Sequence, residues 1–142
     1  MRTESDIGPQ VRVEQVAQHP EPASGWWRVA WHIQNLGQQP LQLLAARLPH
    51  SRFRSEECDL TAMPELEPGA GAQLERPIAC HELPGTVVEN AFLIVRVLWR
   101  EEPWRIFARL RVVFDEQGGP QTTTEVVTVQ QVGFSERLKH LI

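Results

Sequence analysis

The sequence VVENAFLIVRVLWREEPWRIFARLRVVF, residues 87–114, decides the fold. It consists of two runs in which apolar residues alternate with other residues, and the runs meet at Glu101-Glu102-Pro103. In a β-strand every second side chain lies on the same face, so this alternation predicts a β-hairpin with one side turned toward the core. The predicted core face consists of Ala91, Leu93, Val95, Val97, Trp99, Trp104, Ile106, Ala108, Leu110, Val112 and Phe114.

The turn of this hairpin sets which residues lie opposite each other. A turn closed by Arg100 and Pro103, or formed tightly by the two glutamates, places Trp99 opposite Trp104. The two apolar faces then coincide, whereas an offset of one residue would move one of them to the other side of the sheet. Because Glu-Glu lacks the Asn-Gly chemistry of the tightest turns, we expect a slightly longer loop of the same parity.

The other face of the predicted hairpin alternates arginines with large apolar side chains. In the expected register Leu98 opposes Arg105, Arg96 opposes Phe107, Ile94 opposes Arg109 and Phe92 opposes Arg111. One interpretation is a solvated face on which arginine stems cover apolar atoms. The other is a partner-binding interface, because arginine and aromatic side chains are enriched at binding hot spots. Its candidate residues are Phe92, Ile94, Arg96, Leu98, Arg105, Phe107, Arg109 and Arg111.

Composition and charge limit the class of protein. The 142 residues fit one domain, large enough to bury a core without disulfides or metals. The formal net charge of −4 argues against general nucleic-acid binding, although a local arginine face can attract a phosphate or an acidic partner. No apolar run reaches the roughly 20 residues that span a bilayer, and residues 1–10 lack a secretory signal pattern. We expect a cytoplasmic protein without a membrane span.

Prolines and glycines punctuate a series of short alternating runs. Seven or eight such runs without a strong helix predict an all-β, antiparallel β-sandwich. We expect residues 1–9 to be disordered or peripheral, residues 10–132 to form the sandwich, and residues 133–142 to form a short helical tail capped by Ser135. A helix this short must dock on its own domain or on a partner.

Several runs have individual features. One run supplies much of the core through Trp27, Val29, Trp31 and Ile33. Residues 41–48, LQLLAARL, are compatible with a strand covered on both sides, a bulged strand or a short helix. Residues 53–60 and 73–80 predict edge strands, the second because Pro77 interrupts it. A first strand with an irregularity between Val13 and Val16 is expected, and residues 122–132 predict a strand rich in threonine and valine.

Two turn motifs resemble a known family. The strand that begins near Trp27 ends in Asn35-Leu36-Gly37, Pro40 follows, and Leu66-Glu67-Pro68-Gly69 precedes another strand. This pattern resembles the immunoglobulin-like domains of the CARDB-related bacterial β-sandwich type, over roughly residues 24–115. The resemblance implies a seven-stranded immunoglobulin-like fold and a non-enzymatic adhesion or spacer role, with no catalytic residues. The chain departs from that group in its five tryptophans and its C-terminal extension.

No motif in the sequence indicates catalysis or a cofactor. Cys58 and Cys80 are expected to be free thiols, and with His81 and His50 they lack the spacing of a zinc site. An acidic cluster is compatible with calcium binding or with a solvated strand edge: Glu56, Glu57, Asp59, Glu65 and Glu67. We therefore predict no metal, no cofactor and no enzymatic activity.

Two functional hypotheses remain from the sequence. The first is a non-catalytic protein-interaction or self-association module, which would bind a protein partner or form a homo-oligomer through the arginine and aromatic face. The alternative is a module that binds a carbohydrate or another small ligand, with Trp26 as the exposed stacking residue.

Overall fold

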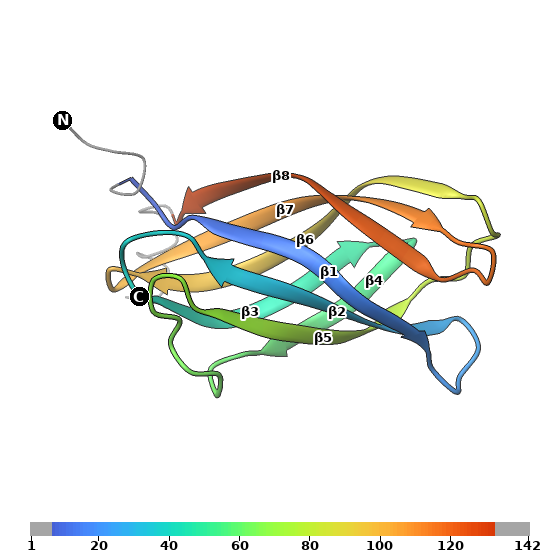
Figure 1. Ribbon diagram of the computed structural model, residues 1–142, viewed down its shortest axis with the longest axis horizontal. Helices are drawn as coiled ribbons and strands as arrows, with labels where there is room; N and C mark the ends of the chain where they lie inside the picture. Colours follow the sequence, from blue (N-terminus) through green and yellow to red (C-terminus); the bar gives the residue numbers. More distant parts are fainter. Residues whose placement is uncertain (1–6, 133–142) are drawn as a thin grey trace, which may run out of the picture.

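The computed structural model describes residues 7–132, which form eight antiparallel β-strands and no helix (Figure 1). The strands are β1 (Val11–Pro20), β2 (Trp26–Asn35), β3 (Leu41–His50), β4 (Phe53–Asp59), β5 (Gly71–Ala79), β6 (Val87–Trp99), β7 (Glu102–Phe114) and β8 (Pro120–Gln131). Their order in the sheet is β1-β2-β5-β4-β3-β6-β7-β8. The predicted all-β antiparallel fold is confirmed. The predicted helical tail, residues 133–142, and residues 1–6 lie outside the described residues.

The sheet folds over so that its two halves face each other, with β1 and β2 in front of β3 and β4 in Figure 1. One half contains β1, β2 and β5, and the other contains β4, β3, β6, β7 and β8. One ladder pair, Arg54 with Ala79, joins the halves through β4 and β5, and the Arg76 side chain adds hydrogen bonds to Ser55 and to the carbonyl oxygen of Glu56. The strands predicted as edges are therefore each paired along one side and almost unpaired along the other.

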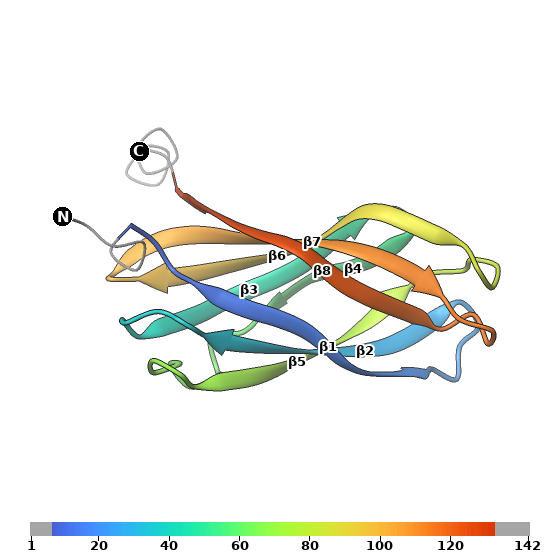
Figure 2. The same ribbon diagram turned by 45° about the horizontal axis from the view of Figure 1, so that its top comes forward.

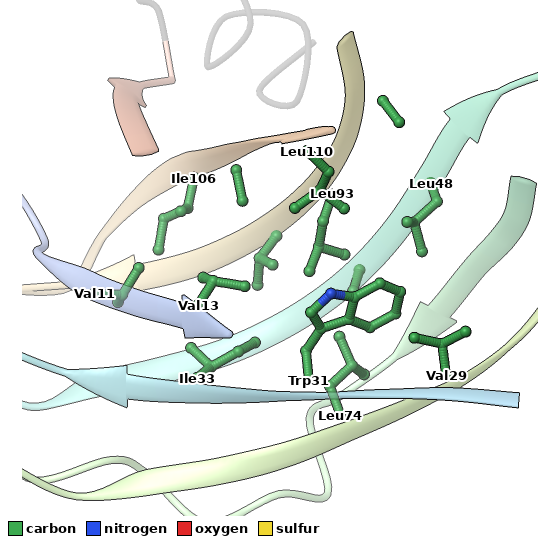
Figure 3. Close-up of a cluster of buried hydrophobic side chains, with 14 of the residues drawn as sticks. Val11, Val13, Val29, Trp31, Ile33, Leu48, Leu74, Leu93, Ile106 and Leu110 are labelled. Atoms are coloured by element: carbon green, nitrogen blue, oxygen red, sulfur yellow. The ribbon is translucent and has the colours of Figure 1, made fainter. Parts of the chain in front are cut away.

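The apolar faces of the two halves form one core. Every residue of the predicted core face of the hairpin is buried. Trp31 of β2 is also fully buried, and its ring meets the ring of Phe53 edge-on at 6.1 Å. Figure 3 shows Trp31 and Ile33 of β2 pointing toward Ile106 and Leu110 of β7. The alternation in these strands thus places their tryptophan-bearing sides in a common interior.

The turn between β6 and β7 differs from the predicted loop. Arg100 and Glu101 form a two-residue turn, and their φ angles are 53° and 65°. Positive φ at both central residues is the geometry of a type I′ turn, whose twist matches that of the strands. Trp99 therefore lies opposite Glu102 rather than opposite Trp104, although the two indole rings still meet edge-on at 5.7 Å. The predicted register is wrong by two residues, which leaves the apolar faces aligned.

Buried Asn35 joins two turns that are far apart in the sequence. Its Nδ2 donates to the carbonyl oxygens of Gln39 at 2.8 Å and Leu66 at 2.9 Å. Its Oδ1 accepts from the backbone amide of Gly37 at 2.9 Å, and its own carbonyl oxygen accepts from Gly69 at 2.8 Å. The Asn-x-Gly turn and the Leu-x-Pro-Gly loop, which carry the immunoglobulin-like resemblance, therefore lie in contact.

Register shifts interrupt several strand pairings, and those in β3 and β1 bear on the predictions. Residues 41–48 belong to β3, whose pairing with β4 shifts between Ala46 and Leu48. The interpretation as a bulged strand is confirmed, and the helical alternative is wrong. In β1, the irregularity predicted between Val13 and Val16 lies slightly later, between Gln15 and Ala17. An extra residue bends a strand locally and redirects its side chains.

The first and last strands of the sheet, β1 and β8, run beside each other without a backbone ladder between them (Figure 2). The side-chain amide of Gln15 connects them. Its Nε2 donates to the carbonyl oxygen of Pro120 at 2.9 Å, and its Oε1 accepts from the amide of Thr122 at 2.8 Å. The hydroxyl of Thr124 donates to the carbonyl oxygen of Val13 at 2.8 Å. Hydrogen bonds from side chains thus link the first and last strands, so the sheet is almost closed.

Candidate functional site

The outward face of β6 and β7 contains all eight predicted partner-binding residues, but in a different arrangement. Arg96 lies opposite Arg105, Ile94 opposite Phe107, and Phe92 opposite Arg109. The predicted regular alternation of arginines with apolar partners is therefore wrong. The tight turn causes the difference, because it moves the register by two residues and keeps every side chain on its expected side. We call these eight residues together the docking face.

Three side chains form the apolar centre of the docking face. The rings of Phe92 and Phe107 meet edge-on, with centroids 6.4 Å apart and planes at 86°. Both phenylalanines are half-buried. Ile94 is only 8% exposed although it lies on the outward side, so neighbouring side chains cover it. Leu98, 37% exposed, extends the apolar surface toward the hairpin turn.

Carboxylates flank three arginines of the docking face. Arg96 lies 3.4 Å from Glu57 of β4, Arg109 lies 3.7 Å from Glu125 of β8, and Arg111 lies 2.9 Å from Glu89 of β6. All six side chains are partly exposed, so each pair contributes only about 0–1 kcal/mol to stability. The pairs restrict where the guanidinium groups lie around the apolar centre.

A groove of about 460 Å³ adjoins the docking face at β3 and β4. It forms where β3 and β4 shift register, because Ala46 pairs with Cys58 while Leu48 pairs with Ser55. Two residues of β4 then oppose one residue of β3. The charged side chains that line the groove, which we call the arginine groove, are Arg47, Arg54, Arg96, Arg105, Glu56 and Glu57.

Sequence alternation does not identify two of these arginines. Arg47 lies at the bulge, where the two-residue period is broken, and Arg54 lies on a strand that reads as a polar edge. The available signal is the concentration of arginine in residues 47–54, RLPHSRFR. The arginines in residues 47–54 do not indicate which strand lies alongside them. In the structure that strand is β6, which supplies Arg96.

Trp26, the candidate stacking residue for a small ligand, is the first residue of β2. It is 39% exposed and lies opposite Ala79 of β5. Among the described residues no second aromatic ring is stacked with it. Trp27, its neighbour, is half-buried and packs against the core. The structure therefore offers one exposed indole at this place, and its ligand-binding role stays a prediction.

The cysteines and other metal-binding side chains do not form a reactive centre in residues 7–132. Cys58 and Cys80 are free, and Cys80 is 6% exposed. Burial, with a contribution from the charge of Glu82, raises the pKa of Cys80 to about 11, so this thiol is protonated at neutral pH. In the same range no three His, Cys, Asp or Glu side chains are grouped to hold a metal ion.

No protein-family model matches the chain, and a search of the curated proteins finds no match. Within residues 7–132 no helix is long and apolar enough to cross a membrane.

Proposed function

We propose that this chain is a non-catalytic protein-interaction module that binds its partner through the docking face. The observation that carries the proposal is the half-buried, edge-on pair of Phe92 and Phe107 at the outer surface of the sheet, 6.4 Å apart. Arginines flanked by carboxylates surround this pair. Aromatic anchors with arginines and a polar rim are the usual composition of a binding hot spot. A binding or spacer role also agrees with the immunoglobulin-like resemblance.

The charge of the face favours a different protein over a second copy of this chain. In a two-fold dimer the same patch meets itself. The arginines of one docking face, including the opposed Arg96 and Arg105, would then approach those of the other. Like charges brought together across an interface are unfavourable. The partner is therefore a protein with acidic side chains around an apolar surface.

Partner capture with matched variants tests this proposal. The double variant Phe92→Ser/Phe107→Ser removes the apolar centre, and Val16→Ser on β1, where Val16 is 53% exposed, is the control. Immobilised protein is cross-linked in an extract of its own cells, and bound proteins are quantified by mass spectrometry. We expect one partner to be retained by the wild type and the control and lost by the double variant. Equal retention by all three proteins would contradict the proposal.

Self-association is tested separately. Sedimentation velocity over a wide range of protein concentration should show a monomer for the wild type and for the double variant. Circular dichroism and thermal unfolding check that the variants keep the fold, which is expected because both phenylalanines are only half-buried. A dimer that is lost on replacing Phe92 and Phe107 would show that the face binds a second copy instead.

A further inference from the structure

We infer that the arginine groove binds an acidic peptide segment of the partner protein. The inference rests on the proposed function and specifies the chemistry of the partner. Four guanidinium groups and two carboxylates line the groove, whereas the whole chain has a formal net charge of −4. A concave positive site on a negatively charged molecule concentrates anions locally. The positive charge of the groove therefore comes from the positions of its arginines and not from the net charge of the chain.

The arginines of the groove come from neighbouring strands. Arg96 and Arg105 lie directly opposite each other on β6 and β7. Arg47 of β3 lies opposite Ile94 of β6. It makes no ion pair with another described residue. An incoming carboxylate can therefore pair with Arg47 without displacing Glu56 or Glu57.

The carboxylates already in the groove show what it can hold. Glu57 lies 3.4 Å from Arg96, and Glu56 lies 2.9 Å from Arg54. Both glutamates are well exposed, so little free energy is lost when they turn into solvent. Guanidinium groups bind carboxylates through paired hydrogen bonds, which favours side chains of Asp or Glu as ligands. Glu56 and Glu57 therefore act as internal competitors of an incoming acidic segment.

The volume of the groove limits its ligand to a short peptide segment. A volume of about 460 Å³ accommodates a few side chains but not a folded domain. The groove is lined by residues of β3, β4, β6 and β7, and it shares Ile94, Arg96 and Arg105 with the docking face. A partner whose apolar residues contact Phe92 and Phe107 can thus place an adjoining acidic stretch in the groove.

Binding of a fluorescein-labelled hexaglutamate peptide to the full chain, followed by fluorescence anisotropy at low ionic strength, tests the inference. We expect Arg96→Gln to weaken binding about fivefold or more. Arg12→Gln, which removes one charge from β1 outside the groove, is the matched control and should change the affinity less than about twofold. Glu57→Gln removes the competitor of Arg96 and should strengthen binding, an effect that misfolding would not produce.

Two results would overturn the inference. One is the absence of peptide binding to the wild type at low ionic strength. The other is an equal loss for Arg96→Gln and Arg12→Gln, because that outcome indicates attraction to overall charge. Neither result changes the dependence of partner capture on Phe92 and Phe107, so failure of the groove and failure of the docking face are distinguishable.

Discussion

Oε1 of Gln15 in β1 accepts a hydrogen bond from the backbone amide of Thr122 in β8 at 2.8 Å. Through Nε2 the same side chain also donates to the carbonyl oxygen of Pro120 at 2.9 Å. One side-chain amide thus satisfies two backbone groups that would be open at the edge of β8. The indole of Trp31 donates to the hydroxyl of Thr122 at 3.1 Å, which links this contact to the core.

Replacing Gln15 should weaken the contact between the first and last strands. Gln15→Leu leaves the amide of Thr122 and the carbonyl of Pro120 without these partners in a partly buried place, which costs roughly 1–3 kcal/mol of unfolding free energy. Urea unfolding measures the loss, and hydrogen exchange should be faster at Thr122. Gln130→Leu, on the exposed part of β8, is the control and should change stability by less than about 0.5 kcal/mol. Equal effects would show that the Gln15 bridge does not stabilise the fold.

Asn35→Ala should be among the most damaging polar substitutions. Asn35 is 2% exposed, and its loss removes the side-chain partners of Gln39, Leu66 and Gly37. We expect a loss of roughly 2–4 kcal/mol, because each buried group left unsatisfied costs about 1–3 kcal/mol. Gln34→Ala removes only an exposed hydrogen bond to Gly69 and is the adjacent control. Chemical denaturation measures the stability of both variants. Similar unfolding midpoints would contradict the stabilising role of the Asn35 side chain.

Glu101→Gly should stabilise the protein. Glu101 has a φ of 65°, a conformation that costs an L-residue roughly 1–2 kcal/mol and that glycine adopts readily. We expect a gain of about 0.5–1 kcal/mol, measured as a rise in Tm. Arg100→Gly should gain less, because the Arg100 guanidinium lies 5.5 Å from the centre of the Trp99 ring and that contact is lost. A Tm lower than that of the wild type would show that strain at Glu101 does not significantly reduce the stability of the protein.

Asp115 should make stability depend on pH in the acid range. A hydrogen bond from the backbone amide of Gly119, with smaller contributions from Gln18, Gln117 and Gln121, holds the pKa of Asp115 below its ordinary value of 3.8. The stabilisation is therefore present above pH 3.8 and is lost as the pH falls through the lowered value. Asp115→Asn should be less stable than the wild type at pH 7, and the difference should disappear in acid. Urea unfolding at several pH values checks this, and a constant difference would contradict the role of the charge.

The strands and the buried faces could be predicted because alternation is a local property of the chain. The two-residue period in residues 87–114 and in the run that contains Trp31 assigns each side chain to a face whatever strand lies alongside. The turn could not be predicted from the same pattern. Registers that differ by two residues have the same parity, so the apolar faces agree with both, and only the backbone at Arg100 and Glu101 selects one.

By itself the sequence determined that this protein is an antiparallel all-β domain, and which side of the β6–β7 hairpin carries arginines and phenylalanines. Only the tertiary structure decided that Arg96 opposes Arg105, that Arg47 and Arg54 join them in a groove, and that Gln15 bridges β1 to β8. The physical reason is that alternation specifies the side of a strand on which a residue lies. The neighbours of that strand depend on turns, bulges and strand order, which bring together residues far apart in the chain.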